Sequence, residues 1–500
     1  VSNSRYQRYS SRSNVEYQAK KWLKLTTNMS FTHTDQQAQF SEGSWGSSGN
    51  IFYITNNMGA IYPLYVRNAD GSLKTENGRQ IYDSNQTNFM RPSVVGNAVR
   101  DNEYNSNKTY TDIFMGQYGA TVTPIEGLDL TANLAATSIN RRQNALYSVF
   151  ASGAASDGGV DVNHSRTFSI NQQYMANWNK TFNDVHNLGI LVGYEQYKYK
   201  YSYLEGYNDH LYDPYIGELD NAKGMDQKSV GSYTDNKMNE GFFGRLQYDY
   251  NNKNFFNASI RRDASSIFAP GHRWGTFGSL GAAWAINEEE FMKDVDWVDL
   301  LKFKVSWGST GNDAGMGYHA YADRYTTSYN NGTGEYSIQM SAKGNENLTW
   351  EKKKAINVGV DFSFFNYRLN GTLEYYNGKT SDLLYNKTVP LSAGMTVSTY
   401  PVNVGELLNR GWELSLDGTI IKKKNLEWSA NLALATNHNE FLSLDPSVEE
   451  VGIKSSSQII RVGGSMQQGY MVKFAGVDPE NGRAQYYVSY DAEGNRLANT

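Results

Sequence analysis

Apolar and polar residues alternate with a period of two along much of this chain, which is the pattern of β-strands. In the segment FFGRLQYDYNNKNFFNASIRRD (242–263), the tetrapeptide NNKN predicts a turn between two such strands. One face of the predicted hairpin carries Gly244, Leu246, Tyr248, Tyr250, Phe256, Ala258 and Ile260. The other face carries Arg245, Gln247, Asp249, Asn257, Ser259 and Arg261. In a soluble sandwich the apolar face packs into a core, whereas in an outer-membrane barrel it contacts lipid and the polar face lines water.

The same alternation recurs along the chain and predicts a strand-rich protein of roughly fourteen strands. It is clearest in the segments 23–31, 128–134, 357–364, 368–375, 412–420 and 426–434. The apolar positions of these segments carry no charge, and the intervening positions carry nearly all of it. A soluble core and a lipid-facing wall both require this separation, so the faces alone leave the two environments open.

Short and long connections alternate between the predicted strands. Short turns are predicted near 19–22, 123–127, 182–187, 251–254, 364–368 and 422–425. Long irregular stretches are predicted at roughly 37–108, 140–163, 205–238, 311–348, 381–401 and 438–470. One connection, NEEEFMKDVDWVDLL (287–301), predicts a short helix where a turn is expected. Short connections at one edge and long ones at the other are typical of outer-membrane barrels, with tight periplasmic turns and extended extracellular loops.

Aromatic residues lie beside the predicted short turns. They are Trp22, Phe255, Phe256, Phe364, Phe365, Tyr367 and Trp428. A belt of aromatic rings at one level suits a membrane–water interface, although edge aromatics of a soluble sandwich are an alternative. So many strands without a helical layer favour closure into a barrel, because closure removes exposed strand edges. We therefore predict an all-β fold, a large antiparallel transmembrane β-barrel of which this chain is a part.

The composition agrees with a thin wall that carries long wet loops. Hydrophobic residues make up 39% of the 500 residues and aromatic residues 14%, with 37 Tyr, 21 Phe and 10 Trp. This hydrophobic share is below that of a typical globular protein. The net charge of −5 lacks the basic footprint that nucleic-acid binding requires. The absence of cysteine excludes disulfides and thiolate metal sites.

No apolar run approaches the roughly 18–20 residues of a membrane-spanning helix. The sequence begins VSNSRYQRYSSRSN, without Met and without the apolar segment of a signal peptide. We therefore expect this chain to be part of a longer polypeptide.

The sequence offers few candidates for catalysis or metal binding. Its seven His residues lack metal-ligand spacing, GSLG (278–281) is no nucleophile elbow, and GSTGN (308–312) lacks the Lys of a phosphate loop. NADG (68–71) and DAEGN (491–495) lack the ligand spacing of calcium loops and predict hairpin turns. We expect no catalytic residue, no metal site and no cofactor.

Aromatic-rich segments within the long connections are the better candidates for ligand binding. The candidate ligand-binding residues are Tyr53, Tyr62, Tyr65, Tyr207, Asp209, Tyr212 and Tyr215. Aromatic faces stack on sugar rings and on peptide side chains, and neighbouring Asn and Asp side chains supply directional hydrogen bonds. The alternative is that these tyrosines only pack the loops over the mouth of the barrel.

A longer motif between residues 261 and 312 is more specific. The stretch RRDASSIFAPGHRWGTFGSLGAAWAINEEEFMKDVDWVDLLKFKVSWGSTGN resembles the SusC/RagA family of TonB-linked outer-membrane transporters. The matching motif residues are Arg261, Asp263, Ser265, Ser266, Phe268, Arg273, Trp274, Gly275, Ala283, Trp284, Glu290, Phe291 and 301–312. Ala264 stands where Gly is common in the family, and Ile267 where a basic residue is common. Segments 345–390, 403–440 and 474–487 also resemble the family, and the match weakens before about residue 240.

The resemblance implies that residues 1–500 are a barrel domain of a TonB-dependent receptor, without the N-terminal plug and the C-terminal strands. It implies a protein of the bacterial outer membrane, of the Bacteroidota, that imports oligosaccharides or oligopeptides. The implied partners are a SusD-like surface lipoprotein acting as a lid, the TonB complex acting through the missing N-terminal parts, and outer-membrane lipid. Two alternatives stay open: a passive porin or adhesin barrel, and a soluble carbohydrate-binding β-protein or glycoside hydrolase. The hydrolase requires a carboxylate pair about 5–10 Å apart.

Overall fold

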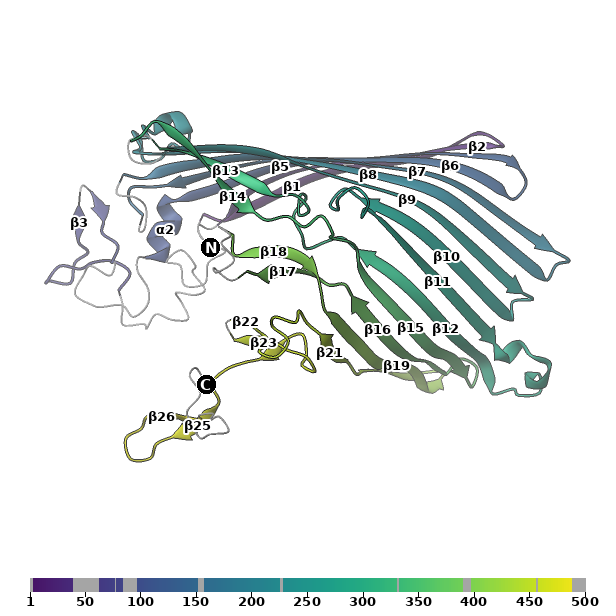
Figure 1. The fold of residues 1–500 in the computed structure, drawn as a ribbon. Coiled ribbons are helices and arrows are strands. Elements are labelled where there is room, and N and C mark those ends of the chain that lie inside the picture. Colours follow the sequence, from purple (N-terminus) through teal and green to yellow (C-terminus); the bar gives the residue numbers. More distant parts are fainter. Residues whose placement is uncertain are drawn as a thin grey trace. The chain divides into compact units, whose positions relative to one another are not determined.

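The computed structural model describes residues 3–38, 63–76, 78–83, 97–151, 157–224, 228–330, 332–389, 397–455 and 457–487. These residues form mainly β-strands, as the alternation predicts (Figure 1). None of the helices in this described part is long and apolar enough to cross a membrane.

In these ranges, fourteen strands follow one another in one antiparallel sheet order, and β21 also pairs with β19. The path agrees with the roughly fourteen strands predicted from the sequence. In sheet order the strands are β1 (Arg5–Lys20), β2 (Leu23–Ala38), β5 (Ser106–Ile125), β6 (Leu128–Tyr147), β7 (Gly159–Phe182), β8 (His186–Asp209), β9 (Lys228–Tyr250), β10 (Asn254–Ser265), β11 (Trp274–Ala285), β12 (Val298–Asn312), β15 (Glu351–Phe364), β16 (Leu369–Ser381), β19 (Glu406–Lys423) and β20 (Leu426–Ala435), with β21 (His438–Ser443).

Smaller elements lie in the connections between these strands. They are β3 (Thr75–Glu76), β4 (Arg79–Gln80), α2 (Ala98–Tyr104), η1 (Leu219–Asn221), η2 (Ile286–Glu288), η3 (Glu290–Met292), β13 (Arg324–Asn330), β14 (Glu335–Ala342), β17 (Leu384–Thr388), β18 (Thr399–Asn403), β22 (Ile453–Ser455), β23 (Gln458–Ile460), β24 (Gln468–Gly469), β25 (Phe474–Val477) and β26 (Ala484–Tyr486).

The chain divides into two compact units. Unit 1 comprises 1–176 and 194–240, and unit 2 comprises 177–193 and 241–500. Strands β7, β8 and β9 each contribute residues to both units. Each unit is therefore described below by its own contacts.

The alternation of short and long connections is confirmed. Connections of two to four residues join β1 to β2, β5 to β6, β7 to β8, β9 to β10, β15 to β16 and β19 to β20. The short helix predicted at 287–301 is confirmed only in its first part, where the single 3-10 turns η2 and η3 lie, and is wrong at its end, because β12 begins at Val298. Val298 and Leu301 pair with Phe364 and Phe362 of β15, so sheet pairing overrides the local helical pattern.

The register of unit 2 places the apolar positions of neighbouring strands on one common face. One continuous row across six strands is Phe256, Ala282, Val305, Val358, Tyr375 and Trp412. The adjacent row, one residue along each strand, is Asn257, Gly281, Ser306, Asn357, Tyr376 and Gly411. Because a one-residue slip would exchange the two faces, this register fixes an apolar face and a polar face across these six strands.

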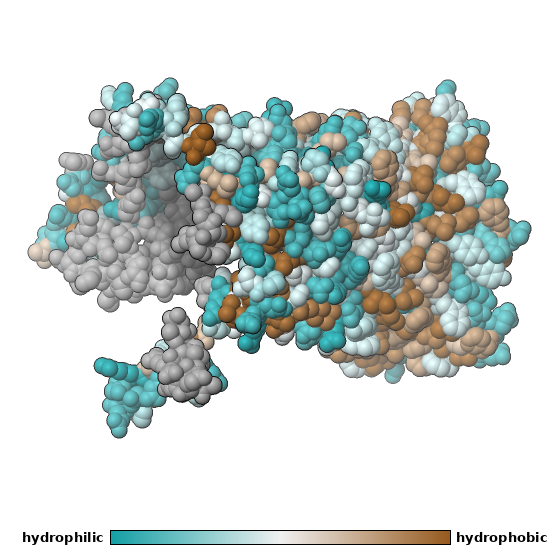
Figure 2. Space-filling model, in the orientation of Figure 1, coloured by the Kyte–Doolittle hydropathy of each residue, from teal (hydrophilic) through white to brown (hydrophobic). Residues whose placement is uncertain are grey.

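The apolar face is exposed, which answers the question that the hairpin at 242–263 raises. Ile260 is 60% exposed, Leu280 50% and Trp412 53%. Over β10, β11, β12 and β16 of unit 2, Figure 2 shows hydrophobic residues gathered toward the strand ends that carry the short turns. A continuous exposed apolar face of this kind is a membrane-contacting surface rather than a core.

Aromatic residues mark both ends of the apolar face. Trp274 and Trp284 lie ten positions apart on the same face of β11. At roughly 3.3 Å per residue and a tilt of about 45°, this separation spans about 23 Å of depth, close to the ~25 Å apolar band of an outer-membrane barrel. On β9 the corresponding segment runs from Phe242, which stacks on Trp274 at 6.3 Å, to Tyr250.

Replacing Leu280 by Arg tests which face meets lipid. Leu280 lies midway between the two tryptophans, and we expect Leu280→Arg to destabilise the folded barrel by about 2–4 kcal/mol in lipid bilayers. The measurement is the free energy of unfolding of the full-length protein in vesicles, read from its heat-modifiable gel migration. The control is Ser279→Arg, because the Ser279 hydroxyl hydrogen-bonds to Ser259 at 2.6 Å on the polar face. Equal destabilisation by both variants would contradict the assignment.

Candidate functional site

The candidate ligand-binding residues that the structure describes all lie in unit 1. Tyr65 forms an isolated bridge with Tyr82, Tyr207 and Asp209 end strand β8, and Tyr212 and Tyr215 follow in the next connection. Tyr53 and Tyr62 lie outside the described residues.

An aromatic row joins two of these candidates through residues that the sequence did not single out. Ring centroids lie 4.7 Å apart between Tyr65 and Tyr82, and 6.4 Å apart between Tyr82 and Tyr104. The row continues from Tyr104 to Phe150 at 5.5 Å, and from Phe150 to Tyr215 at 6.1 Å. These five rings, named here the aromatic row, come from four separate segments of the chain. They bring Tyr65 and Tyr215 to opposite ends of one structure.

Arg79 lies over one end of the aromatic row. Its guanidinium carbon is 4.3 Å from the Phe150 ring centroid and 5.5 Å from that of Tyr215. Such cation–π contacts stabilise an exposed site by about 0.5–1 kcal/mol. Tyr215 nevertheless stays 54% exposed, so part of its ring can contact a solute.

Helix α2 anchors the other end of the row. Its N-cap Asn97 accepts hydrogen bonds from the backbone N–H groups of Val99 and Arg100, and its amide donates to the Asp83 carbonyl at 3.0 Å. The Tyr82 hydroxyl donates to the Glu103 carboxylate on the same helix. Burial of Tyr82, and then this hydrogen bond, raise the pKa of its phenol far above the usual value, so the phenol stays protonated at neutral pH.

Tyr207 and Asp209 are held against neighbouring segments. The Tyr207 ring meets Tyr147 edge to face at 6.4 Å, and a Cβ on Gly159 would lie only 2.6 Å from the Tyr207 hydroxyl. Asp209 is 1% exposed, and its carboxylate lies 3.2 Å from Nδ1 of His210. Nε2 of His210 in turn lies 3.3 Å from Asp157. The geometry gives Asp209 a role in fixing the loop, whereas Tyr212 is 87% exposed.

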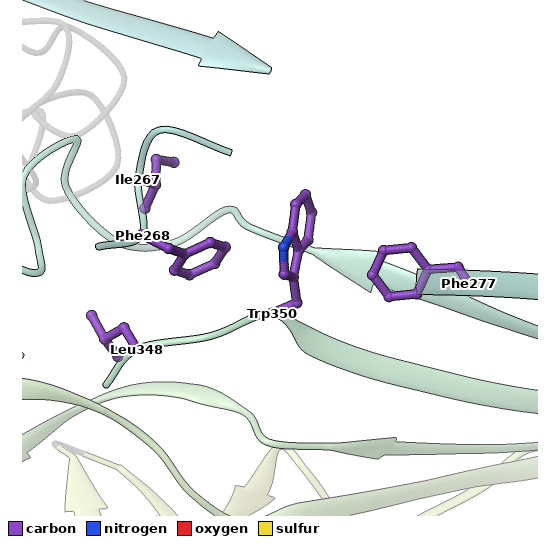
Figure 3. Close-up of a cluster of buried hydrophobic side chains, with 5 residues drawn as sticks. All are labelled: Ile267, Phe268, Phe277, Leu348 and Trp350. Atoms are coloured by element: carbon purple, nitrogen blue, oxygen red, sulfur yellow. The ribbon is translucent and has the colours of Figure 1, made fainter. Parts of the chain in front are cut away.

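A second cluster, in unit 2, is built from the motif at 261–312 and from residues 348–350. Its buried members are Ile267, Phe268, Phe277, Leu348 and Trp350 (Figure 3). The indole N–H of Trp350 donates to the Arg273 carbonyl at 2.8 Å, and Nε of Arg273 donates to the Phe268 carbonyl at 3.1 Å. These bonds fold the connection after β10 back toward the segment that precedes β15. The motif residues thus fix a loop.

The glycines of the same motif make room for Phe277, which faces Arg261 on the polar face. A Cβ on Gly275 would lie 2.6 Å from Phe277 Cζ, and one on Gly311 would overlap that atom outright. Ser265 ties the cluster to the next connection through a 2.7 Å hydrogen bond to Asp313. Periodicity gives no sign of this cluster, and only the motif resemblance points to it.

The polar face of unit 2 carries paired charges. The Lys304 ammonium lies 2.9 Å from Asp361 and also contacts Glu374, and the Lys302 ammonium lies 4.3 Å from the Phe255 ring centroid. Lys304 and Glu374 help to line a groove of about 300 Å³ on this face. These groups can bind polar solutes or a polar protein surface.

An exposed apolar face between two aromatic belts, with a polar face behind it, defines an outer-membrane β-barrel protein. The chain belongs to the family described as "TonB dependent receptor-like, beta-barrel", whose model matches residues 53–494. Its fold class and outer-membrane location are those predicted, and the resemblance to the SusC/RagA family is confirmed.

Individual relatives agree with this assignment. The chain is 28% identical over 483 residues to a TonB-dependent receptor of Formosa agariphila, which covers 95% of this chain and 43% of the relative. It is 30% identical over 342 residues to the TonB-dependent receptor SusC of Bacteroides thetaiotaomicron, which covers 67% of this chain and 33% of that one. The chain therefore spans less than half the length of these curated relatives.

Among solved structures, the fold matches the RagAB peptide transporter with a TM-score of 0.80 at 23% identity. The match covers 99% of this chain and 53% of that one. A second RagAB structure, the peptide importer in its closed-closed state, gives a TM-score of 0.82 at 23% identity over the same shares. Family membership does not favour the porin, adhesin and soluble-protein alternatives.

Adding a methyl group at Gly311 tests the motif cluster. We expect Gly311→Ala to destabilise the full-length protein by about 1–3 kcal/mol, because the new Cβ overlaps the Phe277 ring. The measurement is the denaturant midpoint in detergent. Gly317→Ala is the control, since nothing lies within 4 Å of its Cβ position. A midpoint unchanged by Gly311→Ala would mean that Phe277 is not held where the cluster requires.

Alkaline pH tests the anchoring of helix α2. The raised pKa of Tyr82 means that its contribution to stability is complete below the ordinary tyrosine pKa of about 10 and is lost as the pH rises above it. Amide hydrogen exchange of 98–104, corrected for intrinsic rates, should accelerate in the wild type as the pH rises from about 10 to about 12. Tyr82→Phe cannot ionise and should show a flat profile. An identical rise in both proteins would rule out Tyr82 as the cause.

Proposed function

We propose that this chain is the barrel wall of an active outer-membrane importer, energised through TonB, that takes up an oligosaccharide. The observation that carries the proposal is the polarity of the wall. Its apolar face is exposed between aromatic belts, so the hydrogen-bonding face remains for a solute that crosses the membrane. The wall itself carries out no covalent chemistry.

The long connections supply the contacts that capture the solute. The rings of Tyr215 and Tyr212 are exposed and offer stacking faces. Arg79 adds hydrogen-bond donors beside Tyr215. Tyr65 and Tyr207 support this surface from within, and Asp209 fixes its loop. We also propose Tyr53 and Tyr62, which lie outside the described residues, as ligand-binding residues.

Family membership supports the remaining partners that we propose. We propose residues 1–500 as the barrel domain of a longer receptor, in which an N-terminal plug contacts the TonB complex and further strands complete the wall. A SusD-like surface lipoprotein would close over the long connections as a lid. The RagAB structures, described as a peptide transporter and a peptide importer, support an importing role for the assembled receptor.

An oligopeptide is the second candidate for the imported solute. RagAB, whose fold this chain matches with TM-scores of 0.80 and 0.82, is described as a peptide transporter. Aromatic faces such as Tyr215 also stack on peptide side chains, so the loops alone accept either ligand.

Purification of the full-length protein from outer membranes tests the proposal. Mass spectrometry should find a co-purifying lipoprotein and a bound glycan. A lipoprotein with a peptide mixture would keep the importer and select the second candidate. The absence of both a lipoprotein and a ligand would contradict the importer.

Truncation of Tyr215 tests the capture surface. We expect Tyr215→Leu to weaken binding of the co-purified ligand about 3- to 10-fold, which corresponds to the loss of about 0.5–1.5 kcal/mol of aromatic stacking. Tyr118→Leu is the control, because Tyr118 is 44% exposed on the apolar face. If calorimetry gives equal affinities for the wild type and Tyr215→Leu, Tyr215 does not contribute to the capture surface.

A further inference from the structure

Strand β8 carries a tyrosine at four successive alternate positions. Tyr197, Tyr199, Tyr201 and Tyr203 share one face of the strand, with Glu195 before them and Glu205 after them. Tyr233 of β9 joins them, with ring centroids 5.9 Å from Tyr201 and 5.3 Å from Tyr203. These five residues are named here the tyrosine stripe. All of them belong to unit 1.

The tyrosine stripe lies on the polar face of the wall. Glu195, on the same side of β8, accepts hydrogen bonds at 2.9 Å from the amides of Asn171 and Gln173. On the other side of β8, the apolar residues Ile190 and Val192 are 37% and 54% exposed, as expected of the apolar face. In a barrel of this family the polar face lines the interior, so the stripe faces the solute and not the lipid.

The stripe lies beyond the membrane-crossing part of its strand. Strands β7 and β8 have 24 residues and β9 has 23, whereas about 9–11 residues cross the bilayer. On β9 the apolar segment ends at Phe242, and Glu240, just past it, accepts a hydrogen bond from Tyr194 of β8 at 3.1 Å. Residues 197–203 therefore extend from this level toward the long connections, where solute arrives.

Three rings of the stripe, those of Tyr201, Tyr203 and Tyr233, contact one another and are named here the platform. Tyr201 and Tyr203 have an interplanar angle of 16° and a centroid separation of 6.4 Å, close to the ~6.6–6.8 Å repeat between alternate residues of a strand. The rings of Tyr201 and Tyr203 are thus stacked, and the Tyr233 ring is tilted by 49° and 39° against them. Tyr233 is 52% exposed beside them, so the platform is open to solute.

A row of hydroxyl and amide groups runs beside the platform. The polar side of β7 carries Asn163, Ser165, Thr167, Ser169 and Asn171. Two bonds, from the His210 N–H to the Gly158 carbonyl and between the side chains of Thr181 and Asn187, join residues equidistant from Asp184. The hairpin register is therefore unshifted from end to end, and Thr167 and Ser165 lie opposite Tyr201 and Tyr203.

Charge at the stripe discriminates between solutes. The Tyr203 hydroxyl donates to Glu205 at 2.9 Å, and Glu195 lies at the other end of the row. Lys237 of β9 is the basic residue of the adjoining strand on this side. Carboxylates at both ends disfavour anionic solutes, whereas stacked rings beside hydroxyl and amide groups match the apolar faces and hydroxyl edges of sugar rings.

We propose that the tyrosine stripe, flanked by the hydroxyl and amide row of β7, binds neutral oligosaccharides and guides them along the inner wall. The inference rests on the proposed importer function and deepens it, because it selects a neutral glycan as substrate. It adds five residues to the capture surface that the loops provide.

The test uses full-length protein, purified in detergent, and a panel of neutral hexasaccharides: cellohexaose, maltohexaose, xylohexaose and mannohexaose. At least one should bind by calorimetry and show saturation transfer to its ring protons. The double variant Tyr201→Leu/Tyr203→Leu should weaken that binding at least tenfold. Tyr201→Phe/Tyr203→Phe keeps the rings and should stay within about threefold of wild type. Tyr174→Leu, which removes a tyrosine that is 52% exposed on the apolar face of β7, should change nothing.

Several outcomes would overturn the stripe. They are no binding of any hexasaccharide, unchanged affinity in the Leu double variant, and preferential binding of a peptide that the Leu double variant abolishes. TonB-dependent uptake of the co-purified ligand is measured in the same strains. Uptake that persists at wild-type rate in the Leu double variant refutes the stripe and leaves the importer standing. If the wild-type strain shows no TonB-dependent uptake of the co-purified ligand, the importer itself is refuted.

Discussion

The wall of this protein depends on one constraint: lipid offers no partner to backbone N–H and C=O groups, so each strand must satisfy them by pairing with its neighbours. Pairing fixes the register, and the register decides which side chains share a face. Here it aligns Phe256, Val305 and Trp412 in one row and Asn257, Ser306 and Tyr376 in the next. Backbone hydrogen bonding therefore decides which face of the wall is apolar and which face is polar and able to bind a solute.

The long connections need packing contacts of their own, because the apolar side chains of the wall face lipid and do not pack against them. The structure meets this need with two local clusters. In unit 1 the aromatic row and Arg79 join the loop segments to helix α2. In unit 2 the motif residues Phe268, Phe277 and Trp350 do the same for the connections after β10 and before β15. The family motif is thus explained as loop packing.

Strand length separates these tasks along β7, β8 and β9. One segment of β9, from Phe242 to Tyr250, suffices for the bilayer, and the residues before it continue the same alternation outside the membrane. Outside the bilayer the two faces of a strand no longer need to separate lipid from water, so their side chains can contact a solute. On β8 it presents tyrosines on one side, and on β7 it presents hydroxyls and amides.

Local pattern alone determined the strands, their faces and the short turns, because side-chain periodicity and turn residues act within a few positions. It failed at 298–301, where pairing of Val298 and Leu301 with β15 extends a strand into a locally helical pattern. It found Tyr215 but not Arg79, Tyr104 or Phe150, which lie 65 to 136 residues away in sequence and meet it, directly or through one another, only in the folded loops. The burial of Asp209 beside His210 likewise needed the fold. Whether the apolar face meets lipid or packs into a core was decided only by the tertiary structure. A soluble core and a membrane wall share the same alternation and differ only in what covers the apolar face.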